Sequence, residues 1–143
     1  ESSGNILLQS KDSRVAPLIQ PNFLSKENDV KRLLFGLKIA MSVMDSSSFD
    51  EVRLKKMNWP PRNSTDDVLI EHLKKTLETL YHPVGTCRMG NGENSVVNDK
   101  LQVHGIENLR VADASIMPEI ISGNTNAACL MIAEKAADFI LNN

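Results

Sequence analysis

Two polar loops carry residue types that could perform acid–base chemistry on a small molecule. In the first, His82 stands directly before Pro83, and a residue before proline is biased toward an extended backbone. This arrangement favours presentation of the ring from a stiff turn. With an ordinary pKa of about 6.5, a histidine is a natural general base near neutral pH. A structural histidine that hydrogen-bonds a carbonyl is the alternative, and the residue pattern leaves both open.

The second loop, residues 122–126, precedes the expected last helix. Asn124, Thr125 and Asn126 place polar side chains at a helix N-terminus, where free N–H groups and the helix dipole favour an anion or developing negative charge. Asparagine does not titrate, so Asn124 can act only through hydrogen bonds. Ordinary N-capping by Asn124 or Thr125 is the alternative, and it is compatible with such a site.

A third polar segment, Asp113-Ala114-Ser115, follows a strand-like run. The end of a strand is a place where ligands often meet a sheet. Ser115 together with His82 and Asp113 could also suggest a hydrolase triad. The sequence argues against that interpretation, because it contains no Gly-x-Ser-x-Gly nucleophile elbow.

The cysteines and glycines do not form a recognisable metal or dinucleotide motif. Cys87 and Cys129 have neither CxxC spacing nor a nearby histidine pair, so we predict two buried thiols and neither a disulfide scaffold nor a zinc site. Gly90-x-Gly92 lacks the third glycine and the preceding strand of a dinucleotide-binding loop. We therefore expect no metal site.

The composition narrows the class of protein. The 143 residues are 41% apolar and 24% charged, with a net charge of −2 and 4% aromatic residues. These values fit one globular domain and give no electrostatic or stacking basis for nucleic-acid binding. No uninterrupted apolar run approaches the ~20 residues that span a bilayer. Because the chain opens with Glu1 and lacks an initiator Met, we interpret it as a fragment or a processed product.

The sequence leaves the cellular location open. Residues 63–65, Asn-Ser-Thr, form an N-glycosylation sequon. Such tripeptides also occur by chance, so Asn63 points only weakly to an extracellular parent protein.

The residue pattern in the first half of the sequence predicts two extended segments and two helices. Residues 6–8 read as a strand, and residues 18–19, between two prolines, as an edge strand at most. A helix with an N-cap at Ser25 should run to about Asp45 and bury one apolar stripe. A second helix should begin near Ser64 or Thr65. The predicted stripe of the first helix comprises Val30, Leu33, Leu34, Leu37, Met41 and Met44. The apolar face of the second comprises Leu69, Leu73, Leu77 and Leu80, and His72 lies off that face as a solvated residue.

The residue pattern in the second half of the sequence predicts two short strands and one helix. Residues 101–103 and 109–111 read as strand-like runs around a turn at Gly105. A last helix should run from about Thr125 to Ile140. Its first half is apolar on all sides, which is typical of a helix that packs against another domain.

Several long motifs carry a resemblance to a known family. They are YHPVGTCRMG at 81–90, VVND at 96–99, LQVHGIENLRVADASIMP at 101–118, SGNTN at 122–126 and IAEKAAD at 132–138. In this order they closely resemble the C-terminal region of the glucose–methanol–choline (GMC) oxidoreductases, and the overall sequence is similar to the insect glucose-dehydrogenase-like branch. The resemblance covers nearly the whole chain.

The resemblance implies an FAD-dependent oxidation of alcohols. His82 would take the hydroxyl proton while a hydride leaves the same carbon for the flavin N5. Asn124 falls where the family has a second histidine or an asparagine, and it would hydrogen-bond the substrate oxygen. By the same resemblance, Asp113 and Ala114 would approach FAD largely through their backbone. Thr125 and Asn126 would approach the flavin ring, with the helix dipole favouring negative charge at its N1/O2 side.

The expected fold is α+β, with an antiparallel sheet and about three helices, the last packing toward a missing FAD domain. Residues 1–80 would form the substrate-domain portion and residues 81–143 the active-site and flavin-facing segment. The implied partners are an N-terminal FAD-binding domain of the same parent chain and a small alcohol or sugar. Alone, the chain should not turn over substrate. The alternative is a catalytically inactive fragment that serves as a binding or assembly module.

Overall fold

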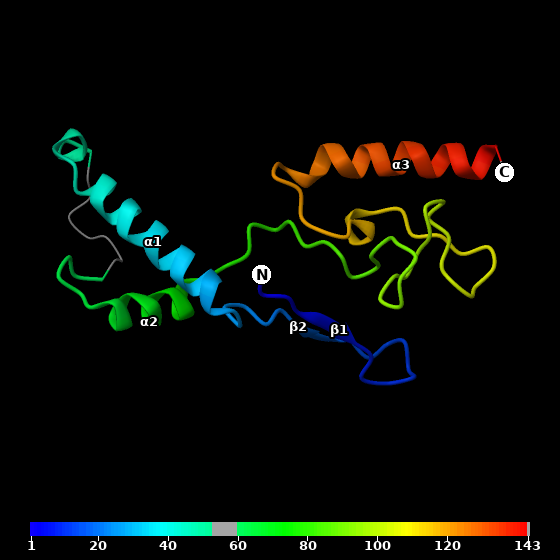
Figure 1. Cartoon of the computed structure of the whole chain (residues 1–143), viewed down its shortest axis with the longest axis horizontal. Coiled ribbons are helices and arrows are strands. Elements are labelled where there is room, and N and C mark those ends of the chain that lie inside the picture. Colours follow the sequence, from blue (N-terminus) through cyan, green and yellow to red (C-terminus); the bar gives the residue numbers. More distant parts are fainter. Residues whose placement is uncertain (53–59, 143) are drawn as a thin grey trace. The chain divides into compact units, whose positions relative to one another are not determined.

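The computed structural model describes residues 1–52 and 60–142. Over these residues the chain has the expected α+β fold, with three α-helices and one small antiparallel sheet (Figure 1). It divides into two compact units, Glu1–Glu78 and Thr79–Asn143. The roles expected for residues 1–80 and 81–143 stay a prediction.

The first unit begins with a two-stranded hairpin. Strand β1 (Asn5–Leu7) pairs antiparallel with β2 (Leu18–Gln20), and Ile6 lies opposite Ile19. The side chains of both strands are exposed. The two prolines that flank β2 remove backbone donors at its ends, which suits a strand in a sheet this small. Both predicted extended segments are confirmed.

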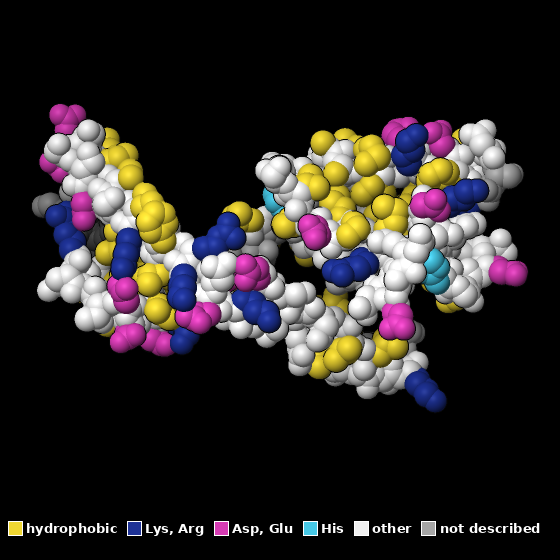
Figure 2. All heavy atoms as spheres, in the orientation of Figure 1, with side chains coloured by type: hydrophobic (Ala, Val, Ile, Leu, Met, Phe, Trp, Pro, Cys, Tyr) yellow, Lys and Arg dark blue, Asp and Glu magenta, His cyan; other side chains and the backbone are white. Residues whose placement is uncertain are grey.

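Helix α1 (Glu27–Met44) contacts α2 (Asp66–Thr76), and η1 (Ser47–Phe49) is a short 3₁₀ turn after α1. The prediction that α1 buries one stripe is wrong, because no residue of α1 is fully buried. Leu33 is exposed, and the other stripe residues are half-buried. Figure 2 shows hydrophobic side chains gathered along α1. The exposed apolar residues of this helix include Phe35, Ile39 and Val43.

The predicted N-cap at Ser25 is also wrong. Helix α1 begins at Glu27, and Lys26 holds the N-cap position without a side-chain hydrogen bond. Near the start of the helix, the carboxylate of Asp29 accepts hydrogen bonds from the Ser2 hydroxyl at 2.6 Å and from the Ser2 N–H. These donors lower the pKa of Asp29 from 3.8 to about 2, the Ser2 hydroxyl having the largest effect.

Helix α2 begins where predicted and ends early. Thr65 is its N-cap residue, and Leu69 and Leu73 are buried as expected. The backbone becomes extended at Leu77, the C-cap residue, so Leu77 and Leu80 do not continue the helical face. Leu80 is exposed.

The second unit begins with loops held by single bridges. The bridges are Met89 with Val97, Val97 with Val103, and Gln102 with Arg110. The strands predicted at 101–103 and 109–111 are therefore wrong as strands. Leu101 has a φ of 64°, outside the extended region. The Asn98 side chain also accepts the N–H groups of Lys100 and Gln102, which closes a local turn.

Helix α3 (Thr125–Leu141) follows the predicted boundaries and packs on η2 (Ala114–Ile116). The core of this unit is small and apolar; its buried residues are Val97, Leu101, Ile116, Met117, Ile132 and Ala136. Elsewhere on α3, Leu130 is 63% and Met131 56% exposed. One side of this helix is thus buried, and another leaves large apolar side chains uncovered within the described chain.

No helix in the described ranges is both long enough and apolar enough to cross a membrane.

Candidate active site

All six predicted site residues lie in the unit Thr79–Asn143. The loop after His82 is joined to η2 by backbone hydrogen bonds, from the Cys87 N–H to the Ser115 carbonyl at 3.0 Å and from the Met89 N–H to the Ile116 carbonyl at 2.8 Å. Because η2 also packs on α3, η2 connects the histidine loop to the helix that begins at Thr125.

Gly85 allows a close approach between this loop and the chain after η2. It has a φ of 87°, and a β-carbon there would lie 3.5 Å from the Met117 carbonyl oxygen. A residue with a side chain at position 85 would therefore have a strained backbone, although its β-carbon would make only an ordinary van der Waals contact with this oxygen. The glycine lets the histidine loop turn sharply while it stays against residues 117–118.

The surroundings of His82 differ from those of a structural histidine. His82 is half-buried, and its ring makes no hydrogen bond with any residue that the structure describes. His104 provides the contrast, since its Nε2 lies 2.9 Å from the Gly90 carbonyl oxygen. This contact is typical of a structural histidine. His82 has no comparable hydrogen bond to a carbonyl within the described residues, so the alternative of a structural histidine lacks the contact that it requires.

The N-terminus of α3 is polar and uncapped. Asn124 is the N-cap residue with an extended backbone, and its side chain makes no capping hydrogen bond. Thr125 is only 8% exposed, yet its hydroxyl has no partner among the described residues. A buried hydroxyl without a partner carries a desolvation cost of about 1–3 kcal/mol. The sequence indicated Thr125 as a site residue, but a sequence does not show which polar atoms lack partners, so the unpartnered hydroxyl was not predicted.

The Asp113 carboxylate is already engaged in local structure. It caps η2 by accepting the Ser115 N–H at 2.8 Å. Its hydrogen bond therefore orients a backbone amide and not a histidine ring. Within the described residues, no hydrogen bond links His82 with Ser115 or Asp113. The arrangement lacks the contacts of a hydrolase triad.

The thiols are less buried than predicted. Cys87 and Cys129 are both free and half-buried. Cys129 packs against the small core of the second unit. No cluster of three or more His, Cys, Asp or Glu side chains that could hold a metal occurs in the described parts of the chain.

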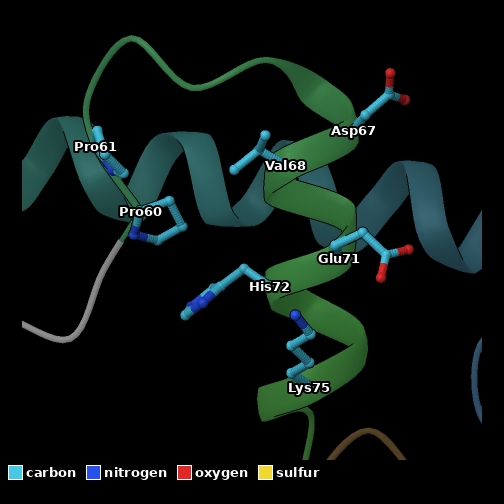
Figure 3. A pocket seen from close by; sticks show the side chains of 7 residues that line it. All are labelled: Pro60, Pro61, Asp67, Val68, Glu71, His72 and Lys75. Carbon is cyan, nitrogen blue, oxygen red and sulfur yellow. The ribbon is translucent and has the colours of Figure 1, made fainter.

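The first unit contains a hollow on one side of α2. It has a volume of about 470 Å³ and is lined by Pro60, Pro61, Asp67, Val68, Glu71, His72 and Lys75 (Figure 3). His72 points toward Pro60 and is half-buried, so it is less exposed to solvent than predicted. The sequence signal for this hollow was the rigid pair Pro60-Pro61, because two consecutive prolines can hold a loop over the helix. None of the six predicted residues lines this hollow.

Comparison with known proteins decides the family. The sequence matches the family described as GMC oxidoreductase over residues 1–133. The chain belongs to the GMC oxidoreductase family. It is 44% identical over 141 residues to an alcohol dehydrogenase [acceptor] of Pseudomonas putida, covering 99% of this chain and 26% of that protein. It is 41% identical over 139 residues to an oxygen-dependent choline dehydrogenase of Escherichia coli O157:H7, covering 97% and 25% respectively.

Solved structures agree with this assignment. A formate oxidase of Aspergillus oryzae RIB40, studied for FAD modification, matches with a TM-score of 0.88 and 29% identity over 98% of this chain and 25% of its own. A pyridoxine 4-oxidase from Mesorbium loti matches with a TM-score of 0.85 and 28% identity over 98% and 27%. The GMC homologues and structures are FAD-dependent flavoproteins.

The GMC chain spans about a quarter of the length of these relatives. The narrower resemblance to insect glucose dehydrogenases is not confirmed by the relatives named above and stays a prediction.

Proposed function

We propose that this chain is the C-terminal part of an FAD-dependent oxidoreductase that acts on CH–OH groups of alcohols or sugars, with His82 as the base. The observation that carries the proposal is the half-buried, unbonded His82 ring on a loop fastened to η2, in a chain of the GMC family. Residues 1–80 contribute the substrate-domain portion and residues 81–143 the active-site segment.

The residues at the start of α3 fit a flavin. The Thr125 hydroxyl is buried without a partner, and the first turn of α3 has no capping side chain. A polar ring edge placed there would satisfy both, and the helix dipole would favour negative charge on it. Thr125 and Asn126 would hold the ring. Asp113 and Ala114 would contribute backbone groups, because the Asp113 side chain is engaged in capping η2.

His82 and Asn124 divide the remaining chemistry. When bound, FAD supplies the acceptor for the hydride that leaves the substrate carbon. A ring nitrogen of His82 accepts the hydroxyl proton, so that the alcohol loses one proton and one hydride and becomes a carbonyl compound. The Asn124 amide donates a hydrogen bond to the substrate oxygen and stabilises its developing negative charge. Asn124 holds no proton to exchange.

The uncovered apolar residues of α3 suggest where the rest of the protein packs. Leu130 and Met131 are large and exposed in the described chain. Burial of these apolar side chains against another domain would lower the free energy of the protein. We assign their partner to the N-terminal FAD-binding domain of the same parent chain, since the relatives are about four times as long.

The sequon supports an extracellular parent. Asn63 is exposed in a turn directly before α2, and the Ser64 N–H donates to the Pro61 carbonyl. A glycan could extend from this position into solvent. A glycan mass on the peptide containing Asn63, purified from the native source, would support an extracellular location, and an unmodified peptide would argue against it.

A catalytically inactive binding or assembly module is the alternative function. His82 and Asn124 weigh against it, because both residues are present in this sequence and a site without a function would be free to lose them. The native protein from its source separates the two. A mass several times 15.8 kDa with a flavin absorption band supports the oxidoreductase. A colourless protein of 15.8 kDa supports the module.

A further inference from the structure

Tyr81 adopts a backbone conformation that bulky residues rarely take. It directly precedes His82, and its φ is 62°, in the left-handed region. Its side chain is 77% exposed, so little packing against the described residues offsets the strain. A conformation of this kind persists only where the surrounding structure requires it.

The other non-glycine residues with a left-handed backbone in the described chain have evident compensation. Asn22 and Asn108 are of the type that tolerates this region best. Leu101 is buried in the core, and Leu24 is half-buried. Tyr81 has neither a tolerant side chain nor burial.

Two local restraints hold the chain on either side of His82. The Tyr81 N–H donates to the Thr79 Oγ1 at 3.0 Å, which fastens the entry to the turn. Pro83 restricts His82 to an extended backbone. The left-handed turn at Tyr81 therefore sets the direction from which the chain enters His82, and Pro83 limits any adjustment afterwards.

We propose that Tyr81 is a positioning residue for His82, and that it acts through its left-handed backbone and not through its aromatic ring. The proposal rests on the function proposed above, in which His82 accepts the substrate proton. A change that disfavours the left-handed conformation would rotate the chain at residue 81 and move the ring of His82 away from the substrate.

Two ringless variants of the complete protein separate backbone from ring. Tyr81→Asn keeps a residue that tolerates the left-handed region, and Tyr81→Val introduces a β-branched residue that disfavours it. We expect kcat of Tyr81→Asn to stay within about threefold of the wild type. A misplaced catalytic group lowers rate steeply, so we expect Tyr81→Val to lower kcat by roughly 10-fold or more. KM and the pH at which the rate rises should change little in both.

A second readout does not depend on turnover. Relief of strain should give Tyr81→Asn a Tm equal to or above that of the wild type, whereas Tyr81→Val should have a lower Tm. If Tyr81→Val does not fold, Tyr81→Ala replaces it, because alanine also disfavours the left-handed region without a β-branch.

The outcomes separate this proposal from the function on which it rests. An equal loss of kcat in both variants would overturn it in favour of the ring, and no loss in either would overturn it outright. Wild-type turnover in His82→Ala would refute the proposed function itself. In that case the order of the Tm values still decides whether Tyr81 holds a strained backbone, and equal values would reject it.

Discussion

His82 and His104 belong to the same unit, yet their rings have different surroundings. The ring of His104 is hydrogen-bonded to a backbone carbonyl, and that of His82 is free of any such bond within the described chain. This difference supports His82, and not His104, as the base. A ring without a partner can accept a proton from a substrate.

Replacing His82 tests the residue that carries the proposed chemistry. We expect His82→Gln to lower kcat by ~10²–10⁴-fold, the usual contribution of a general base. In the wild type the rate should rise with pH through a single ionisation, because Asn124 cannot titrate. Steady-state kinetics of the complete protein over a pH series measures both.

His72→Gln is the matched control, since His72 is also half-buried but lies on α2 and lines a separate hollow. It should keep wild-type kcat. A rising limb that survives unchanged in His82→Gln would contradict the assignment of the base.

The carboxylate of Asp29 gives a prediction about folding. Its pKa is lowered to about 2 chiefly by the Ser2 hydroxyl, so its ionised form favours the folded state. This stabilisation is present above the ordinary pKa of 3.8 and is lost as pH falls through about 2. We expect Ser2→Ala to raise the pKa of Asp29 toward 3.8, as measured by carboxyl-carbon NMR titration.

Ser10→Ala is the control for this titration, because the Ser10 hydroxyl accepts the Asp12 N–H and makes no contact with Asp29. It should leave the pKa of Asp29 at about 2. A value near 3.8 in the unsubstituted protein would show that the Ser2 contact does not form in solution.

At the scale of elements, sequence patterns were reliable where they spanned several turns. The polar segment 122–126 followed by an apolar run predicted the start of α3 correctly. Elsewhere, local hydrogen bonds and backbone conformation made the secondary-structure prediction wrong. The strand at 101–103 failed because Leu101 is left-handed and the Asn98 side chain bonds two nearby amides. The sequence also gave no sign of the left-handed Tyr81, since this conformation is unusual for its residue type.

The exposed residues of α3 can be tested by oxidation. Met131 is 56% exposed and Met117 is 7% exposed in the described chain. If an FAD-binding domain covers Leu130 and Met131, both methionines should oxidise slowly in the complete protein. Peptide mass spectrometry after peroxide treatment measures their rates, with free methionine as the fast reference. Oxidation of Met131 near the rate of free methionine would contradict the proposed docking of α3.

At the scale of the whole molecule, family membership and catalytic function have different support. The match over residues 1–133 places the chain in the GMC family. The activity belongs to a protein about four times as long, so it remains our proposal. The sequence predicted the family because several motifs occur in one order. It could not predict the alcohol, because part of the pocket wall is expected from the segment outside this chain.

We propose that His82 accepts the hydroxyl proton of an alcohol whose hydride is accepted by bound FAD. The most direct measurement mixes the complete protein with a series of alcohols, choline and sugars in the absence of oxygen and follows the flavin absorption band. We predict rapid bleaching with at least one alcohol in the wild type and bleaching slowed by ~10²-fold or more in His82→Ala. A wild-type band that no alcohol bleaches, or equal bleaching rates in both proteins, would contradict the proposed function.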